Sequence, residues 1–378
     1  MNRKDFLRTS ALATAGSLFL PQFLKALEGP GSLGAGERIL VIVQLGGGND
    51  GLNTVVNYRN DLYYQARPRL AISAKEVIPL NDAQGLHPAL APLQPHYDAG
   101  DLAILNSVGY PEPDRSHFRS MDIWQTASAA DTYLETGWLG RYLDGSSQEF
   151  SRPTAAIEVG NRLSLALKGK QIKGLALSDP QRFHATAATP WFRAISQAHS
   201  QHDHANSQAA YLYKTLAASI SSAKYIFETT RTARNRVEYP TNPLAHSLKT
   251  TAQMILAGLD TRVFYVDTSG FDTHVNQAGK HERLLSNYAQ AMDAFAKDLK
   301  AGGRWKDVAI LTFSEFGRRV AQNASGGTDH GTANNVFVMG GQLGKSGILN
   351  AAPDLADLDQ GDLKYQVDFR QVYAELLG

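Results

Sequence analysis

The chain has 378 residues, with 43% hydrophobic and 19% charged side chains and a formal net charge of +1 at pH 7. This length is enough to bury one large α/β core or two smaller ones. The near-neutral charge gives no reason to expect nucleic acid or an anionic membrane surface as a partner. Because the sequence contains no cysteine, disulfides, zinc–thiolate sites and cysteine nucleophiles are excluded. Any metal ion must therefore be bound through oxygen and nitrogen atoms.

Residues 1–35 have the layout of an export signal. Residues 2–8 are basic and residues 9–24 are apolar with many small side chains, which is typical of such signals and too short to span a membrane comfortably. The order Arg-Lys-x-Phe-Leu-Arg resembles a twin-arginine signal in which lysine replaces the second arginine. An ordinary secretory signal or a retained N-terminal anchor is the alternative. We expect a periplasmic or secreted bacterial protein with no stable membrane span once the signal is removed.

The remainder, residues 36–378, is predicted to form a single α/β domain. Apolar runs of strand length lie at residues 39–45, 102–108, 155–159, 263–266, 308–313 and 336–339. Most of them are continuous rather than alternating, as expected of strands buried on both faces. Helical patterns lie between them, for instance at residues 207–232 and 281–299. The pattern predicts a mainly parallel central sheet flanked by helices on both faces.

The first strand ends in a glycine-rich segment with one carboxylate. Residues 46–48 are glycines and Asp50 follows them, but there is no GxGxxG pattern and no Lys-Ser/Thr pair, so a phosphate-binding loop is not indicated. Asp50 either binds a metal ion at the strand end or belongs to an Asn-Asp-Gly turn. The residues alone leave both interpretations open.

The second strand leads to Asp114-Arg115-Ser116-His117-Phe118-Arg119. A serine at the start of a helix has backbone N–H groups nearby that favour anions. Ser116 could therefore attack a phosphate or sulfate ester while Arg115 or Arg119 holds the equatorial oxygens. Ser116 could instead cap the helix, and the spacing alone favours the cap.

Residues 180–250 are polar and are predicted to form a helical cap or insertion. This stretch contains His199, His202 and His204. No carboxylate-rich apolar frame surrounds them, so we interpret them as part of a solvated helix end or loop rather than as metal ligands.

Two later strands are each followed by candidate metal ligands. Asp272 and His274 come just after residues 263–266, and Glu315 just after residues 308–313. Asp272 and His274 could reach one ion from a loop, or Asp272 could cap the helix that follows. Asn276 could support such a site or contact a substrate.

The pair Asp329-His330 precedes the last strand, in a loop rich in glycine. Ligands of open α/β sheets gather outside the carboxyl ends of the strands, and carboxylates and histidines from well-separated segments lie at such ends here. Mixed oxygen and nitrogen ligands suit zinc, manganese or a similar divalent ion.

These motifs resemble those of an exported bacterial family of unknown function in the alkaline phosphatase/sulfatase superfamily. The matching stretches are GGGNDGLNTVV (46–56), DRSHF (114–118), GFDTHVNQ (270–277), FSEFGRR (313–319), GTDHG (327–331) and VDFRQVYAELL (367–377). They occur in order over nearly all of the chain beyond the signal. The resemblance implies an alkaline phosphatase-like fold.

The resemblance also implies roles for residues. Asp50 matches the first metal-binding carboxylate and Ser116 the nucleophile, with Thr54 a weaker nucleophile candidate. Asp272 and His274 match a mid-chain pair of ligands. The remaining implied ligands are Glu315, Asp329 and His330.

Two departures from the superfamily pattern concern the metal ligands. Glu315 replaces an aspartate, and Phe316 stands where a histidine ligand would be expected. One of two metal sites could therefore be weakened, rebuilt from His117 or Asp329, or empty.

The sequence thus favours an exported hydrolase of phosphate or sulfate esters that uses a serine nucleophile and one or two divalent ions, zinc or manganese. Its substrate would be a small-molecule or polysaccharide ester. A non-catalytic binding or assembly protein of the same fold is the first alternative, supported by Phe316. A hydrolase of carboxylic esters or polysaccharide esters is the second.

Overall fold

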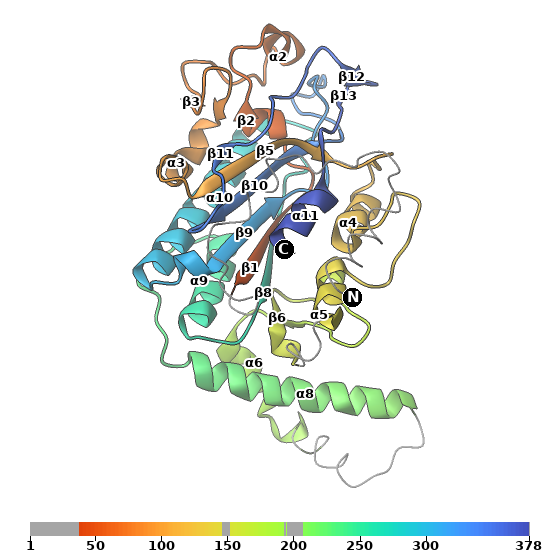
Figure 1. The fold of residues 1–378 in the computed structure, drawn as a ribbon, viewed down its shortest axis with the longest axis vertical. Coiled ribbons are helices and arrows are strands. Elements are labelled where there is room, and N and C mark those ends of the chain that lie inside the picture. Colours follow the sequence, from red (N-terminus) through yellow and green to blue (C-terminus); the bar gives the residue numbers. More distant parts are fainter. Residues whose placement is uncertain (1–37, 146–151, 193, 195–206, 378) are drawn as a thin grey trace.

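A computed structural model describes residues 38–145, 152–192, 194 and 207–377 (Figure 1). Its centre is a nine-stranded sheet with the order β11-β5-β10-β9-β1-β8-β6-β7, and β14 also pairs with β5. The expected export signal and the histidines His199, His202 and His204 lie outside the described residues. Among the described helices, none is long and apolar enough to cross a membrane.

The central sheet contains the six predicted strands and three short ones that were not predicted. They are β1 (Ile39–Gly46), β5 (Leu102–Gly109), β6 (Ala156–Val159), β7 (Leu175–Leu177), β8 (Val263–Ser269), β9 (Val308–Phe313), β10 (Asn334–Gly340), β11 (Gly347–Ile348) and β14 (Val367–Asp368). All six predicted strands are present. The two predicted helices are present as α8 (Ser207–Thr230) and α10 (Gln277–Ala301). The expected α/β class, with a mainly parallel sheet, is confirmed.

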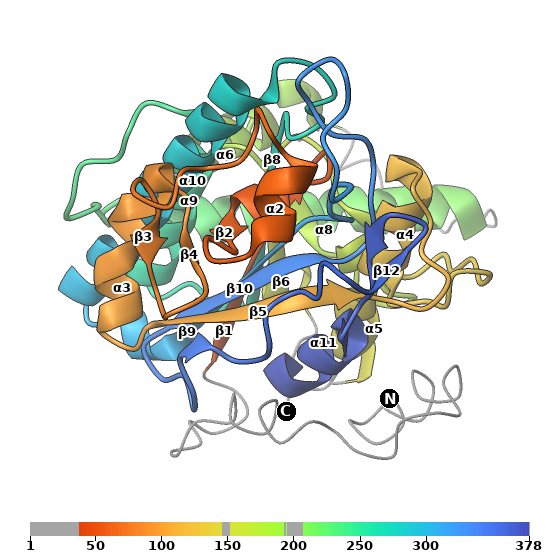
Figure 2. The same ribbon diagram turned by 90° about the horizontal axis from the view of Figure 1, so that it is seen from above.

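Helices cover both faces of this sheet (Figure 2). On one face, α9 (Pro243–Leu256) and α10 pack against Val41 and Val43 of β1. On the other face, α4 (His117–Thr126), α5 (Trp138–Gly145) and α11 (Phe369–Leu377) pack near Leu40 and Ile42. Neighbouring residues of β1 point to opposite faces, and both faces are buried. This explains why the strand is apolar without alternation.

Strand β10 runs antiparallel to both of its neighbours, β9 and β5, whereas the other described pairs of the central sheet are parallel. The chain therefore returns from β9 to β10 through a loop, residues 314–333, with no crossover helix. Both ends of that loop lie at the edge where the parallel strands end. A backbone bridge between Arg318 and His330 joins its two arms.

The described chain also contains smaller elements. A three-stranded sheet is formed by β2 (Val55–Val56), β4 (Gly85–Leu86) and β3 (Ile78–Pro79), and β12 (Leu358–Asp359) pairs with β13 (Asp362–Leu363). The remaining helices are α2 (Asp61–Ala66), α3 (Gln94–Asp98) and α6 (Pro180–Ala187), together with the 3-10 helices η2 (Gly51–Asn53), η3 (Pro88–Leu93), η4 (Pro153–Ala155), η5 (Leu165–Leu167) and η6 (Trp305–Asp307).

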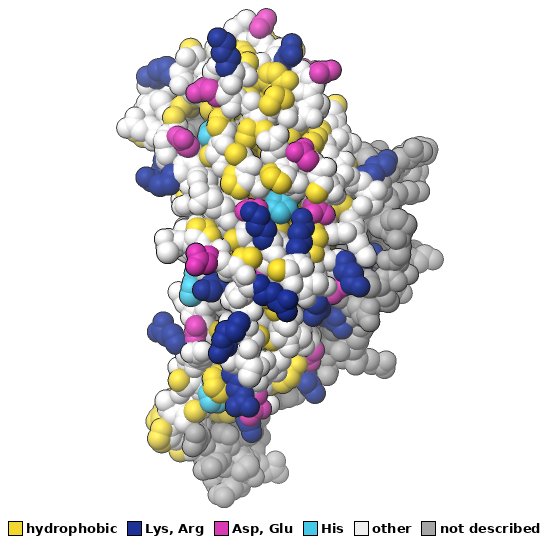
Figure 3. Space-filling view, turned by 90° about the vertical axis from the view of Figure 1, so that its left-hand side faces the viewer, with side chains coloured by type: hydrophobic (Ala, Val, Ile, Leu, Met, Phe, Trp, Pro, Cys, Tyr) yellow, Lys and Arg dark blue, Asp and Glu magenta, His cyan; other side chains and the backbone are white. Residues whose placement is uncertain are grey.

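The stretch expected to be an insertion, residues 180–250, contains α6, α8 and the first half of α9. Helices α6 and α8 pack on each other and lie at one end of the molecule (Figure 1). Helix α9 instead belongs to the layer that covers the sheet, since Leu244 and Leu248 are part of the main core. Figure 3 shows basic side chains along the middle of one face, with acidic side chains among them.

Candidate metal centre

Three segments meet at the carboxyl edge of the parallel strands. The loop after β8 carries Asp272 and His274, the start of α4 carries His117, and the β9–β10 loop carries Glu315 and His330. Because β1 lies between β8 and β9 in the sheet, the loops that follow these strands are neighbours. This is the position at which open α/β sheets bind ligands.

One carboxylate oxygen, Oδ1 of Asp272, is approached by three imidazole nitrogens. Nε2 of His274 lies 2.9 Å from it, Nε2 of His330 3.3 Å and Nε2 of His117 3.7 Å. The Nε2 atoms of His274 and His330 are 3.0 Å apart. Ligands bound tetrahedrally to one zinc ion at about 2.0–2.2 Å lie roughly 3.4 Å from one another. The observed separations are close to that spacing.

The other ring nitrogen of each histidine is held by an oxygen acceptor. Nδ1 of His117 lies 2.8 Å from Oε1 of Glu315, Nδ1 of His274 lies 3.2 Å from Oδ1 of Asp329, and Nδ1 of His330 lies 2.8 Å from the Arg115 carbonyl. With a cation bound, each Nδ1 would donate to this acceptor and each Nε2 would present its lone pair, as in metal-ligating histidines with an outer carboxylate or carbonyl.

The donor set fits a divalent ion. His117, Asp272 and His330 each offer one ligand atom, and these atoms lie within 4.8 Å of one another. Nε2 of His117 is buried and has no hydrogen-bond partner among the described residues. The Nε2 atoms of His274 and His330 are 3.0 Å apart, so both would present their lone pairs to a cation bound between them. The chemistry is that of a histidine-rich zinc or manganese site.

Arg318 fixes the charge of the central carboxylate. Its side chain is fully buried and donates to Oδ1 of Asp272 at 2.7 Å and to the backbone carbonyls of Gly48 and Phe271. Burial raises the pKa of Asp272, but the hydrogen bond and charge of Arg318 outweigh it and lower the pKa to about 2. Asp272 is therefore ionised at neutral pH. The neighbouring Gly47 has φ 115°, and a Cβ there would lie 2.5 Å from the Asp272 backbone nitrogen, so the close approach requires glycine.

Glu315 and Phe316 hold the histidine rings. Oε1 of Glu315 also accepts from the backbone N–H of Gly47 at 2.8 Å, and the hydrogen bond to this carboxylate raises the pKa of His117. Burial lowers the pKa of His330. The Phe316 ring packs against the rings of His117 and His330, each at 4.8 Å between centroids. Phe316 thus restrains the orientation of two candidate ligands, and His117, named from the sequence as a substitute ligand, is part of the group.

Asp50 lies apart from this group. Its carboxylate is fully buried, 2.6 Å from Nη1 of the equally buried Arg67, and also accepts from Gln277. Burial raises the pKa of Asp50, but Arg67 outweighs this effect and lowers it. Thr54 is also buried, and its hydroxyl donates to the Asp50 carbonyl at 2.7 Å. The structure therefore does not bring these two residues to the candidate ligands.

Ser116 occupies the N-cap position of α4, and the structure gives its side chain no capping hydrogen bond within the described chain. It is exposed and lies between Arg115, whose carbonyl holds His330, and His117. The Arg115 guanidinium is bonded to the buried Asp362. The Arg115 side chain, just before α4, is therefore already paired with a carboxylate of the protein.

The other two residues proposed to contact substrate have different positions. Arg119 donates to the carbonyls of Ala129, Ala130 and Thr132, which ties down the loop after α4. Asn276 is exposed at the start of α10, in the left-handed region with φ 47°.

The sequence did not single out Arg318 or Arg67, although both are buried beside predicted site residues. Arg318 is part of the stretch FSEFGRR, and its place in that motif was the one sign in the sequence that it belongs to the site. Arg67 lies in a segment that carries no recognisable motif, so the sequence offered no indication of its role.

The fold and this site define an α/β protein with a candidate metal centre built from histidine and aspartate. Residues 101–377 match the family model described as protein of unknown function (DUF1501), and the chain belongs to this family. No curated protein matches the sequence.

Similar solved structures share little sequence with the chain. The lipoteichoic acid synthase LtaP from Listeria monocytogenes is 11% identical with a TM-score of 0.41, covering 98% of this chain and 82% of that one. A zinc complex of the C-terminal periplasmic domain of EptC from Escherichia coli is 10% identical with a TM-score of 0.37, covering 82% and 74%. Alkaline phosphatase from the Antarctic bacterium TAB5 is 10% identical with a TM-score of 0.37, covering 89% and 98%.

Proposed function

We propose that this chain is an exported hydrolase of phosphate or sulfate esters that depends on one divalent ion, zinc or manganese. The proposed ligands are Asp272, His274, His330 and His117. One observation carries the proposal: three histidine Nε2 atoms converge on one aspartate oxygen, while each Nδ1 is held by an outer acceptor. Histidines held in this way by outer acceptors are typical of metal ligands.

In this proposal Ser116 is the nucleophile. Its hydroxyl is exposed and free of a cap bond within the described structure, and it is one residue from His117. A bound divalent ion would lower the pKa of a nearby oxygen nucleophile and neutralise charge on the ester. Ser116 Oγ would form the bond to phosphorus or sulfur while the bond to the alcohol oxygen breaks, and water would later release the acid from the serine.

Other residues of the chain would bind and orient the ester. The first backbone N–H groups of α4, a helix of ten residues, favour an anion at the position next to Ser116. Glu315, Asp329 and the Arg115 carbonyl would keep the three rings in the ligating orientation. Arg318 would keep Asp272 ionised.

The test combines the metal content of the purified protein with ester hydrolysis. We expect Ser116→Ala to lose hydrolysis of phosphate and sulfate esters by at least about 100-fold, with metal content and folding unchanged. Asp272→Ala should lose the ion. His246→Ala, at an exposed histidine far along the chain on α9, is the matched control and should keep both. Full metal content in Asp272→Ala would show that the ligand assignment is wrong.

A metal-binding protein without catalysis is the second candidate, and two ion pairs favour it. Asp50 is neutralised by Arg67, and Arg115 is engaged by Asp362, so two groups that the sequence predicted to belong to the site have internal partners. Under this proposal the ion binds but no ester is turned over, and Ser116→Ala changes nothing. Faster hydrolysis of carboxylic or polysaccharide esters than of phosphate and sulfate esters would instead identify a hydrolase of carboxylic or polysaccharide esters.

A further inference from the structure

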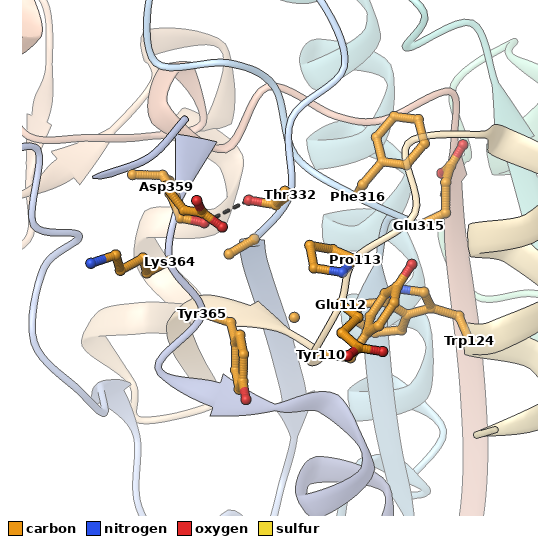
Figure 4. Close-up of a pocket in the computed structure, with 13 residues that line it drawn as sticks. Tyr110, Glu112, Pro113, Trp124, Glu315, Phe316, Thr332, Asp359, Lys364 and Tyr365 are labelled. Atoms are coloured by element: carbon orange, nitrogen blue, oxygen red, sulfur yellow. Dashed lines mark hydrogen bonds between the residues drawn. The ribbon is translucent and has the colours of Figure 1, made fainter. Parts of the chain in front are cut away.

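A cavity of about 360 Å³ borders the candidate metal centre. Its lining comes from the end of β5 and the loop after it, from α4, from both arms of the β9–β10 loop, and from the β12–β13 hairpin and the segment after it. Glu315 and Phe316 form one side of the cavity (Figure 4). The same two residues hold the rings of His117 and His330. The cavity therefore shares a wall with the candidate ligands.

The inner part of the cavity is aromatic. Tyr110, Trp124 and Phe316 line it and are almost fully buried, while Tyr365 lies at the mouth with 41% of its side chain exposed. The Trp124 ring is stacked between Phe313 and Phe369, with centroids 4.8 and 4.3 Å away. The faces of this indole are thus covered by the protein.

The indole N–H of Trp124 is buried and finds no acceptor in the described part of the chain. An unpaired buried donor costs about 1–3 kcal/mol. A hydroxyl oxygen of a bound ligand that accepted from this N–H, after a small adjustment of the cavity, would therefore stabilise the complex. The neighbouring Tyr110 hydroxyl already bonds with Ser120 at 2.9 Å. Tyr110 therefore has a partner, whereas the Trp124 N–H is left to bond with an acceptor on a ligand.

The charge around the cavity disfavours an anion. Its lining contains the carboxylates Glu112, Glu315 and Asp359 and one ammonium, Lys364, whose charge is engaged by Asp357. An anionic ligand would be repelled by the carboxylates. A neutral ring with a hydroxyl group suits both the aromatic wall and the unpaired indole donor. The volume is at the lower end of the roughly 300–1,000 Å³ that small-molecule sites occupy, which is room for about one ring-sized group.

We propose that this cavity binds the neutral, ring-bearing alcohol part of the ester, either a phenol or a sugar ring. The proposal rests on the proposed function for its link to hydrolysis. The acidic part of the ester would lie at the metal centre and the ring in the cavity, with Glu315 and Phe316 between them. The substrate class is then a monoester of a neutral ring alcohol, rather than a nucleotide or another polyanion.

The experiment measures binding without turnover. The probes are phenol and methyl β-glucoside, with 4-hydroxybenzoate as the anionic counterpart of phenol. Each is titrated into the whole protein, with and without added zinc, while the indole N–H resonances of tryptophan are followed by NMR. Trp124→Phe assigns its own resonance. We expect a neutral probe to shift the Trp124 resonance with a dissociation constant of about 1–10 mM, since ring-sized ligands bind weakly.

Two variants and one matched control test the location. Tyr365→Ala removes an aromatic side chain at the mouth and should weaken binding about fivefold. Trp124→Phe keeps an aromatic ring but removes the N–H and with it the reporter resonance, so its binding is measured from the NMR signals of the probe; it should weaken binding by a similar factor. Trp305→Phe is the control, because Trp305 also has a buried indole N–H without a described partner but lies on η6, outside the lining of this cavity. It should leave binding unchanged.

The results of this binding experiment can be distinguished from those of the metal experiment. Binding of phenol alone or of the glucoside alone supports the proposal and identifies the source of the ring. The proposal is overturned if neither neutral probe shifts Trp124, if 4-hydroxybenzoate binds more tightly than phenol, or if Tyr365→Ala has no effect. A protein that binds a neutral ring but holds no metal would instead contradict the proposed function and leave the cavity assignment standing.

Discussion

At the scale of single residues, buried charges decide which groups remain available for chemistry. Asp272 has an exposed side chain but is bonded to the fully buried Arg318, so it stays ionised and faces the histidines. Asp50 is completely buried and is bonded to Arg67. Both aspartates follow strands of the same sheet, but three imidazole nitrogens lie within 3.7 Å of Oδ1 of Asp272, whereas Asp50 is bonded to Arg67 and Gln277. The partner of each carboxylate, rather than its place after a strand, sets its role.

The pair between Asp50 and Arg67 gives a prediction on stability. Arg67→Met would leave Asp50 buried without its cation, and breaking a buried pair on one side destabilises by about 3–5 kcal/mol. Arg67 also donates to the Val320 carbonyl at 2.8 Å, a bond that would be lost as well. Urea unfolding of the purified variant measures the change in the free energy of unfolding.

The control for Arg67→Met is Arg152→Met, at an ion pair with Asp260 that spans 3.6 Å and is largely exposed. Exposed pairs contribute about 0–1 kcal/mol, so this variant should unfold nearly as the parent does. A loss below about 1 kcal/mol in Arg67→Met would contradict a structural role for the pair.

Glu158 gives a prediction on pH dependence. Burial raises the pKa of this carboxyl from 4.5 to about 7, against the opposing hydrogen bonds from Ser164. Since the folded state holds the proton more tightly than the unfolded state, the contribution to stability is full below about pH 4.5 and is lost as the pH rises through about 7. The full effect is on the order of 3 kcal/mol.

Glu158→Gln resembles the protonated acid and should remove this dependence. The free energy of unfolding is measured for both proteins between about pH 4.5 and 8, and the difference between them isolates Glu158 from other titrating groups. We expect the variant to gain stability relative to the parent as the pH rises. A difference that stays constant over this range would refute the assignment.

At the scale of elements, the antiparallel strand β10 determines the site. Because it reverses direction after β9, the β9–β10 loop begins and ends at the same edge of the sheet. Glu315 at its start and His330 near its end can then act on one centre. A crossover helix in this place would have carried His330 to the opposite edge.

The hairpin between β12 and β13 provides a prediction at this scale. Its central residues, Gln360 and Gly361, both have positive φ, at 51° and 88°. Two-residue hairpin turns of this kind favour Asn-Gly, and glutamine tolerates the left-handed region poorly. Gln360→Asn should therefore stabilise the protein by about 0.5–1 kcal/mol, measured by thermal unfolding. The same substitution at the exposed Gln290, within helix α10, should not stabilise; equal gains at both positions would rule out the turn as the cause.

At the scale of the whole molecule, the candidate ligands lie far apart in the sequence, from His117 to His330. An ion that binds only the folded chain therefore stabilises the entire fold. We expect about one ion per chain, since Asp50 is already neutralised by Arg67. Free ion at about 100 times its dissociation constant should raise the free energy of unfolding by about 2.7 kcal/mol.

Thermal unfolding in the presence of a chelator, and again after addition of zinc or manganese, measures this gain. Asp272→Asn should abolish the gain, while His246→Ala should retain it. Equal stabilisation of Asp272→Asn and the parent would place the ion elsewhere. Two ions per chain would contradict the role given to Arg67.

The central sheet was predictable because each of its longer strands is buried on both faces and is therefore a continuous apolar run. The run at residues 39–45 is an example, since its alternate side chains enter the two cores. The short strands β7, β11 and β14 contain two or three residues, which is too little pattern to recognise. The direction of β10 was not predictable either, because an apolar run has the same composition in both directions.

The sequence by itself determined the α/β class and the segments that carry Asp272, His274, Glu315 and His330, since buried strands and polar strand ends are local patterns. Only the tertiary structure decided that His117 joins them, that Arg318 lies against Asp272, and that Asp50 pairs with Arg67. Those contacts join residues that are distant in the chain or carry no motif. Their geometry depends on the order and direction of the strands, which no local pattern encodes.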